Sequence, residues 1–183
     1  MEYIAGIDLG TTNSEIAIVK EDVPEILLVD NQKMMPSCVA FSQDNGLLVG
    51  QVAKNQMILN PDNTILSIKR KMGQNVTVKL NDRELKPEEV SSLILRELVK
   101  HASSSLNANI KKAVITVPAY FDDDQRKATI NAGELAGINV VRIINEPTAA
   151  ALAYDYNLEK DQKILVYDLG GGTFDASIVV IES

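Results

Sequence analysis

The chain has 183 residues and a net charge of −7, and 45% of its residues are hydrophobic while 23% are charged. The composition is typical of a folded globular protein. The negative net charge disfavours nucleic acid as a partner, because phosphate backbones bind basic surfaces. The first apolar run is cut short at Asp8 and no later run has the length of a membrane span, so we expect neither a signal peptide nor a membrane anchor. A lone cysteine, Cys38, excludes an internal disulfide and favours a reducing compartment, so we expect a cytoplasmic location.

The first third of the chain carries mainly β-strand signals. Apolar runs at 4–7 and 15–19, on either side of a turn that contains glycine, predict a β-hairpin, and further strands are predicted at 25–29 and 38–41. Apolar residues with helical spacing predict a short helix over 51–59, which ends before a proline.

Three basic residues, Lys69, Arg70 and Lys71, follow one another directly. Such a run usually forms a solvated face, and the spacing alone favours this interpretation. The alternative is that one of the three side chains turns inward to neutralise a bound phosphate.

The rest of the chain alternates strands and helices. The predicted order is a hairpin over 76–85, a helix that begins at Pro87, a strand at 113–117, a helix over 122–136, a strand at 140–144 and an alanine-rich helix that opens at 145 and runs to 154. Asp122 and Gln125 have the spacing of a capping box. We therefore interpret the acidic run 122–124 as the start of a helix rather than as a metal site.

Two stretches of the chain repeat one pattern. The first reads Ile7-Asp8-Leu9-Gly10-Thr11-Thr12-Asn13, and the second reads Tyr167-Asp168-Leu169-Gly170-Gly171-Gly172-Thr173-Phe174-Asp175. Each lies between two apolar runs, so each predicts a strand, a tight glycine turn and a second strand. Glycine and hydroxyl residues at such a turn leave backbone N–H groups free to bind an anion, and two facing loops would hold a polyphosphate. A P-loop and a dinucleotide-binding fingerprint are excluded, because helices rather than strands follow the glycines in those motifs.

Each of the two loops has an aspartate at the end of its first strand, Asp8 or Asp168. Mg²⁺ prefers oxygen ligands, keeps several waters and needs only one or two carboxylates beside the substrate phosphates. The two aspartates therefore suit a magnesium ion that is bound to a polyphosphate. Either loop alone fits an ordinary hairpin turn, and it is the matched second copy that favours phosphate binding.

Four further side chains suit the transfer of a phosphoryl group to water, which requires charge neutralisation and an oriented water molecule. Lys69 could neutralise negative charge, and Glu146, at a predicted helix start, could orient the water or a metal-bound water. Asp175 could accept a proton, with help from the hydroxyl of Thr173.

Five stretches resemble the N-terminal part of the ATPase domain of the seventy-kilodalton heat-shock chaperones of the DnaK type. In chain order they are Gly6-Ile7-Asp8-Leu9-Gly10-Thr11-Thr12-Asn13-Ser14, Ile68-Lys69-Arg70, Val117-Pro118-Ala119-Tyr120-Phe121, Ile144-Asn145-Glu146-Pro147-Thr148-Ala149-Ala150-Ala151 and Asp168-Leu169-Gly170-Gly171-Gly172-Thr173-Phe174-Asp175. They have the order of the family and extend over the whole chain, so the resemblance is specific.

The resemblance implies an α/β fold of the actin-like, ribonuclease-H-like type, with a mixed β-sheet flanked by helices and a truncated second lobe. Residues 1–162 would form the first lobe, with a small peripheral insertion around 37–112. Residues 163–183 would form the opening, incomplete hairpin of the second lobe. ATP or ADP would lie between the lobes with Mg²⁺, and K⁺ is a further candidate ion.

The resemblance also implies roles for single residues. Hydrolysis would depend on Lys69, Glu146, Asp175 and Thr173, while Asp8 and Asp168 would bind Mg²⁺ through water. The phosphate contacts would come from Gly10, Thr11, Thr12, Asn13, Gly170, Gly171, Gly172 and Thr173.

Three residues would serve communication rather than chemistry. Pro118 and Arg126 would form a switch that reports the nucleotide state to a peptide-binding domain. Arg142 would lie near the surface that meets a J-domain co-chaperone and the interdomain linker. The full-length protein would also have a nucleotide-exchange factor and unfolded client peptides as partners.

A fragment of such a protein would bind and hydrolyse ATP weakly, and it could self-associate through exposed strand edges. Two other functions use a similar phosphate clamp, namely a small-molecule kinase and an actin-like assembly module. The motifs at 118–121 and 146–151 disfavour the kinase. Intact Lys69, Glu146 and Asp175 favour hydrolysis over a purely structural role.

Overall fold

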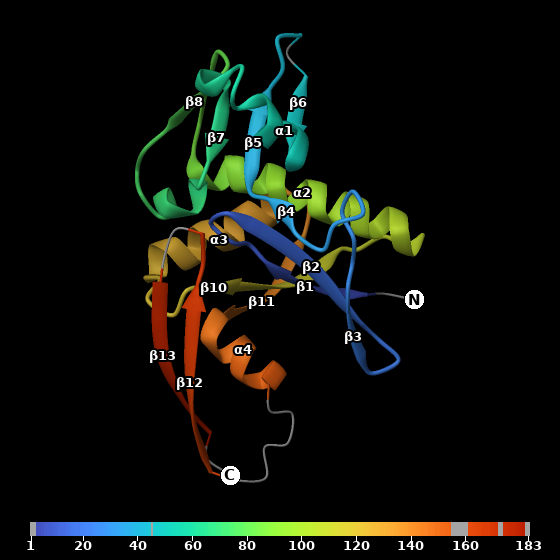
Figure 1. The fold of residues 1–183 in the computed structure, drawn as a ribbon, viewed down its shortest axis with the longest axis vertical. Helices are drawn as coiled ribbons and strands as arrows, with labels where there is room; N and C mark the ends of the chain where they lie inside the picture. The colour runs from blue at the N-terminus through green and yellow to red at the C-terminus, as the bar shows by residue number, and fades with distance from the viewer. Residues whose placement is uncertain (1–2, 45, 155–160, 172–173, 182–183) are drawn as a thin grey trace.

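The structure is a computed structural model that describes residues 3–44, 46–154, 161–171 and 174–181 (Figure 1). Its main sheet has six strands, in the order β11-β10-β1-β2-β3, with β4 paired to β2. β1 runs parallel to β10 and antiparallel to β2, and β10 runs parallel to β11. The bounds of these strands are β1 (Ile4–Asp8), β2 (Asn13–Lys20), β3 (Val23–Ile26), β4 (Met35–Pro36), β10 (Lys112–Val117) and β11 (Asn139–Asn145).

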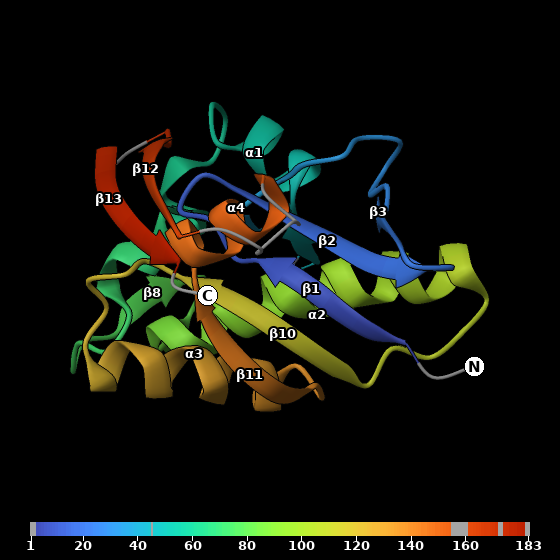
Figure 2. The same cartoon turned by 90° about the horizontal axis from the view of Figure 1, so that it is seen from below.

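Helices cover both faces of this sheet. α2 (Pro87–Leu106) and α3 (Asp123–Leu135) lie on one face, and α4 (Glu146–Tyr154) lies on the other (Figures 1 and 2). The capping box predicted for α3 is confirmed, because Gln125 N donates a hydrogen bond to Asp122 Oδ1 and Asp122 N donates one to Gln125 Oε1. The expected α/β fold, with a mixed sheet flanked by helices, is also confirmed.

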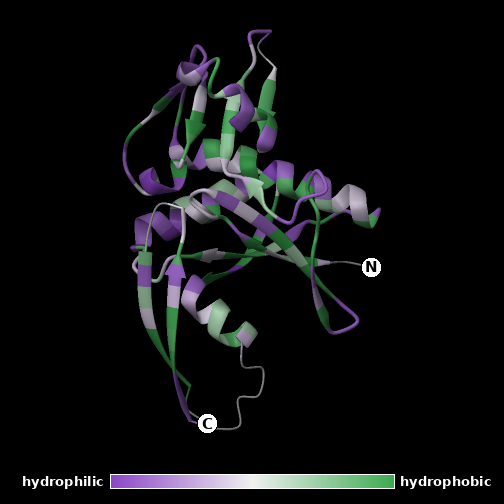
Figure 3. Ribbon diagram, viewed as in Figure 1, coloured by the Kyte–Doolittle hydropathy of each residue, from purple (hydrophilic) through white to green (hydrophobic). Residues whose placement is uncertain are grey.

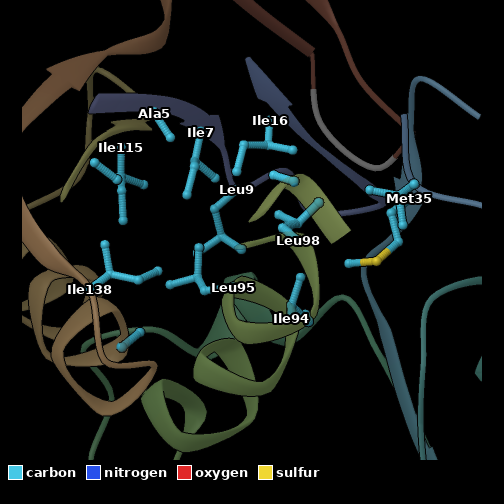
Figure 4. Packing of buried hydrophobic residues seen from close by; sticks show 14 of the residues in the cluster. Ala5, Ile7, Leu9, Ile16, Met35, Ile94, Leu95, Leu98, Ile115 and Ile138 are labelled. Carbon is cyan, nitrogen blue, oxygen red and sulfur yellow. The ribbon is translucent and has the colours of Figure 1, made fainter. Parts of the chain in front are cut away.

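The main hydrophobic core lies between the sheet and α2 (Figure 4). Ile7, Ile16 and Ile115 project from three neighbouring strands, and they are at most 1% exposed. Leu95 and Leu98 of α2 are fully buried in the same cluster. Burying one such side chain contributes roughly 1.5–3 kcal/mol, so these contacts hold α2 against the strands. Side chains alternate along β1, so the residues beside Ile7 in sequence point to the opposite face.

Two small sheets lie on the far side of α2 from the main sheet (Figure 1). One has the strand order β6-β5-β7, and the other is the hairpin of β8 and β9 that the sequence predicts over 76–85. The elements of this region are β5 (Cys38–Phe41), β6 (Leu47–Val49), α1 (Gln51–Gln56), a 3₁₀ turn (Pro61–Asn63), β7 (Thr64–Leu66), a second 3₁₀ turn (Ile68–Lys71), β8 (Val78–Leu80) and β9 (Arg83–Leu85).

A separate antiparallel hairpin consists of β12 (Gln162–Leu169) and β13 (Phe174–Ile181), and α4 contacts both strands. One face of this hairpin is apolar and exposed, and Figure 3 shows that hydrophobic stretches occur in both strands. The large apolar side chains on that face are Leu165, Tyr167, Leu169, Phe174, Ile178 and Val180. Among the described residues, no helix combines the length and the apolar character that a bilayer crossing requires.

Several element boundaries differ from the sequence predictions, and two of the differences have a clear local cause. The third strand spans Val23–Ile26 rather than 25–29, and it begins early because Glu21 and Asp22 both have positive φ and form a tight turn. The helix predicted over 51–59 ends at Gln56, whose side-chain amide donates a 2.7 Å hydrogen bond to the carbonyl oxygen of Phe41. The last apolar residues of the predicted span, Ile58 and Leu59, are exposed, so their helical spacing does not reflect burial.

Candidate functional site

The first glycine loop connects β1 to β2. Asp8 ends β1 and pairs with Glu15 across the hairpin, so the predicted strand, turn and strand are confirmed. The turn requires Gly10, because a Cβ at that position would collide with the carbonyl oxygen of Asn13. Thr116 Oγ1, from the neighbouring strand β10, donates a 3.0 Å hydrogen bond to Asp8 Oδ1 and so orients that carboxylate.

The second glycine loop connects β12 to β13 and meets the first loop. Asp168 and Asp175 are directly opposite each other in this hairpin. Gly171 lies so close to Thr12 that a Cβ at Gly171 would be 2.5 Å from Thr12 Oγ1. The tips of two loops from opposite ends of the chain are therefore in contact. Two residues to which the sequence assigns phosphate or hydrolytic roles, Gly172 and Thr173, lie outside the described residues.

A cavity of about 280 Å³ lies between the two loops. Asp8 and Asp168 both line it, together with Lys69, Pro118 and Glu146. Its wall also includes seven loop residues, which are Gly10, Thr11, Thr12, Asn13, Leu169, Gly170 and Gly171. The structure thus brings the two aspartates, the glycine turns and one buried cation around a single space. These are the components that binding of a magnesium polyphosphate requires.

Lys69 and Glu146 form an ion pair inside this cavity. Lys69 Nζ donates a 2.6 Å hydrogen bond to Glu146 Oε1, and the two side chains are only 8% and 17% exposed. Lys69 Nζ also lies 5.8 Å from the centre of the Phe121 ring. The interpretation of the basic run as a solvated face is therefore wrong for Lys69, whereas Arg70 and Lys71 are exposed. The 3₁₀ turn that contains all three residues directs one of them inward.

The carboxyl group of Glu146 has an altered acidity. Burial raises its pKa above the ordinary value, and the ion pair with Lys69 partly opposes this effect. The charges of Asp8 and Asp168 raise the pKa of Glu146 further. Glu146 is thus electrostatically coupled to both loop aspartates.

A second, smaller cavity of about 170 Å³ adjoins the first, since Pro118, Glu146 and Asp168 line both. Asp175 lines this second cavity rather than the one between the loops. Tyr120 is part of the same wall, and its pKa is raised by burial and by the nearby carboxylates of Asp175, Glu146 and Asp168. Asp175 is thus near the other acidic residues, but it does not line the cavity between the glycine loops.

Arg126 connects two elements beside these cavities. Its Nε donates a 3.0 Å hydrogen bond to the carbonyl oxygen of Phe121, in the loop after β10. Its Nη2 donates a 2.8 Å hydrogen bond to Asn145 Oδ1, at the end of β11. Pro118 lies in that same loop and lines both cavities, while Arg142 is exposed on β11 and lines neither.

Three residues near the site were not expected from the sequence. Glu15 and Met34 line the cavity between the loops, and Ser37 is hydrogen-bonded to the first loop. The pKa of Glu15 is raised by burial and by the charge of Asp8, while Lys33 lowers it. The place of Glu15 follows from the hairpin register opposite Asp8, but no signal in the sequence places Met34 or Ser37.

No cluster of three or more histidine, cysteine, aspartate or glutamate side chains in the described part of the chain is close enough to hold a metal ion without other ligands. The acidic run 122–124 accordingly has the structural role that the sequence predicts, because Asp122 is the N-cap of α3. Mg²⁺ that is bound to a polyphosphate needs only one or two carboxylates, because phosphate oxygens and water supply its other ligands.

Comparison with known proteins identifies the family. A family model described as Hsp70 protein matches residues 4–79 and 74–183. The chaperone protein DnaK of Thermotoga neapolitana is 57% identical to this chain over an alignment of 183 residues. The alignment covers 98% of this chain and 31% of that protein. The proteins of the same name from Thermosipho melanesiensis and Thermotoga maritima are 57% and 56% identical, with the same coverage.

The fold therefore defines an actin-like α/β protein, as the sequence resemblance implied. The chain belongs to the Hsp70 family. It spans 31% of the length of the curated relatives that it matches.

Proposed function

We propose that the chain binds ATP and takes part in its hydrolysis to ADP and phosphate, within the ATPase domain of a molecular chaperone. One observation supports this most strongly: Asp8 and Asp168, from two glycine hairpins in contact, line one cavity with the Lys69–Glu146 ion pair. The relatives are chaperone proteins of the DnaK type, which supports the chaperone role.

In this proposal the two loops hold the phosphate groups. Glycine turns allow backbone N–H groups to approach an anion closely, and threonine hydroxyls add further donors. The residues that would contact phosphate are Gly10, Thr11, Thr12, Asn13, Gly170, Gly171, Gly172 and Thr173, of which the structure describes the first six. The contact between Thr12 and Gly171 supports simultaneous binding by both loops.

Asp8 and Asp168 would hold Mg²⁺ through water molecules, and the donor set fits this ion. Both side chains offer hard carboxylate oxygens to one cavity, and the hydrogen bond from Thr116 leaves the second oxygen of Asp8 available. The bound ion would neutralise charge on the phosphate oxygens. K⁺ is a further candidate for an ion that binds in the same acidic cavity.

The side chains of the chain itself would then carry the hydrolytic step. A water molecule attacks the terminal phosphorus, and the bond from that phosphorus to the bridging oxygen of ADP breaks. Lys69 stabilises the negative charge of the phosphate oxygens, and Glu146 orients the water. Asp175 accepts the proton that the water loses, with the hydroxyl of Thr173 as a relay.

We further propose an organisation in lobes, with residues 1–162 as the first lobe, the region around 37–112 as its peripheral insertion, and 163–183 as the start of a second lobe. Pro118 and Arg126 would report the nucleotide state to a peptide-binding domain. Arg142, which is exposed on β11, would lie near the surface that meets a J-domain co-chaperone and the interdomain linker. A nucleotide-exchange factor, client peptides and a cytoplasmic location complete the proposal for the full-length protein.

The exposed apolar face of the β12–β13 hairpin supports one property of the isolated chain. We propose that this hairpin mediates self-association, since strand edges and apolar sheet faces favour pairing. Light scattering that shows only monomer at high protein concentration would contradict this.

Phosphate release from ATP, measured with the purified chain and millimolar Mg·ATP, tests the hydrolytic function. We expect slow turnover that Lys69→Met reduces at least tenfold, while Lys100→Met, an exposed lysine on α2, leaves it unchanged. Consumption of ATP that depends on an added sugar, with no release of free phosphate, would instead support a kinase. Equal rates in Lys69→Met and the original chain would contradict the proposed role of Lys69.

A further inference from the structure

Ser37 anchors the first glycine loop from outside the cavity. It directly follows β4, which pairs with the start of β2. Its backbone N–H donates a 2.8 Å hydrogen bond to the carbonyl oxygen of Thr12. Its side-chain Oγ donates a 2.7 Å hydrogen bond to the carbonyl oxygen of Gly10. One residue thus binds two carbonyl groups of the same short loop.

Ser14 extends this contact into a directed chain of hydrogen bonds. Ser14 Oγ lies 2.8 Å from Ser37 Oγ. The hydroxyl of Ser37 has one proton and donates it to Gly10, whose carbonyl can only accept, so Ser14 must be the donor to Ser37. Ser14 is 0% exposed and Ser37 is 3% exposed, so water does not compete for these bonds.

The chain of bonds determines which way the loop presents its N–H groups. In a trans peptide the C=O and N–H bonds point to opposite sides. Holding the Gly10 carbonyl on Ser37 therefore turns the N–H of Thr11 away from Ser37. Thr11 lines the cavity between the loops, whereas Ser37 does not, and we infer that the side away from Ser37 is the side that faces the cavity.

We propose that Ser37, supported by Ser14, is a positioning residue for phosphate binding by the first glycine loop. This inference rests on the proposed function, because it assumes that the N–H groups of the loop bind phosphate. Neither serine contacts the cavity, so each acts through the orientation of Gly10 and Thr12. A purely structural role would change stability without a specific effect on phosphate affinity.

Ser92 provides a matched control for the loss of a buried serine hydrogen bond. Ser92 Oγ donates a 2.7 Å hydrogen bond to the carbonyl oxygen of Glu89 in α2, and Ser92 is 4% exposed. Ser92→Ala therefore removes the same kind of bond at a similar burial, but away from the glycine loops. Ser14→Ala is an intermediate variant, because it keeps the bond from Ser37 to Gly10.

Two measurements on the purified chain and its variants test the inference. Amide hydrogen exchange without nucleotide reports how firmly the loop 10–13 is held. Calorimetric titration with Mg·ATP reports phosphate affinity. We expect Ser37→Ala to increase exchange in this loop and to weaken Mg·ATP binding about fivefold to tenfold, which corresponds to one lost hydrogen bond. Ser14→Ala should have a smaller effect in the same direction, and Ser92→Ala should change neither measurement.

The outcomes separate this inference from the proposed function. Unchanged loop exchange in Ser37→Ala would overturn the anchoring role. Faster loop exchange with unchanged Mg·ATP affinity would overturn the positioning role while leaving ATP binding intact. If the original chain does not bind Mg·ATP at all, the proposed function fails and the positioning role fails with it, whereas the exchange data still decide whether Ser37 anchors the loop.

Discussion

Lys69 and Glu146 are 77 residues apart in sequence, yet their side chains form a buried ion pair with a distance of 2.6 Å between Nζ and Oε1. Lys69 belongs to a 3₁₀ turn beside the small sheets, and Glu146 begins α4 on the opposite face of the main sheet. The pair therefore links the two sides of the molecule across the edge of the cavity.

Removal of one partner should be more harmful than removal of both. Lys69→Met leaves the Glu146 carboxylate buried without its cation, and we expect it to lower the free energy of unfolding at pH 7 by roughly 3 kcal/mol. The double variant Lys69→Met with Glu146→Gln should lose less stability than Lys69→Met alone, and therefore less than the sum of the two single variants. Urea unfolding of all four proteins measures this coupling, and strictly additive losses would contradict a direct interaction.

The same pair predicts a pH dependence. Burial raises the pKa of Glu146 in the folded state above its value in the unfolded chain. The folded protein therefore loses stability as the pH rises from the unfolded pKa through the folded pKa, because Glu146 must then ionise while it is buried. Without Lys69 this pKa should rise further. The stability difference between Lys69→Met and the original chain should therefore narrow as the pH falls from 7 toward the ordinary glutamate range, because the variant's Glu146 takes up its proton first. A difference that stays constant over this range would contradict the shift.

Gly171 should tolerate no side chain, because Thr12 occupies the space. A Cβ at Gly171 would lie 2.9 Å from Thr12 Cβ, so Gly171→Ala must separate the two loops. We expect at least tenfold weaker Mg·ATP binding with less than about 1 kcal/mol change in stability, since Gly171 itself is exposed. Gly6→Ala is the control, because a Cβ there has no neighbour closer than 4.0 Å. Equal affinities in the two variants would contradict the contact between the loops.

Cys38 should be chemically inert until the protein unfolds. It is fully buried, and burial raises the pKa of its thiol to about 11, with a smaller opposing effect from Lys54. A thiol reagent at pH 8 should therefore modify Cys38 only at the rate of unfolding.

The same raised pKa predicts an alkaline loss of stability. Since an unfolded cysteine ionises near about pH 8.5, the free energy of unfolding should fall as the pH rises from there toward 11. Cys38→Ala should lack that part of the loss of stability at alkaline pH. Rapid labelling of Cys38 in the folded chain would contradict its burial.

Arg126 should hold the loop that contains Pro118. Arg126→Ala removes hydrogen bonds to the carbonyl oxygen of Phe121 and to Asn145, and we expect a loss of about 1–2 kcal/mol in stability. Amide exchange should increase over 118–121. Lys127→Ala, an exposed neighbour on the same helix, should change neither quantity. An unchanged exchange rate at 118–121 in Arg126→Ala would show that other contacts fix this loop.

Local sequence signals predicted much of the fold. The two hairpins, the capping box of α3 and the proline start of α2 depend on neighbouring residues, and all are present. The inward turn of Lys69 was not favoured, because its partner Glu146 is distant in sequence and only tertiary packing brings them together. Met34 and Ser37 were missed for the same reason, since the pairing of β4 with β2 places them beside the first loop.

Binding of Mg·ATP by Asp8→Asn, Asp168→Asn and the double variant is the most direct test of the shared phosphate site. Calorimetric titration of the purified chain should give weak binding that either single variant reduces at least tenfold. The double variant should lose little more than the worse single variant, because both aspartates would act on one ion. Full affinity in either single variant, or independent effects of the two substitutions, would contradict a site shared between the two glycine loops.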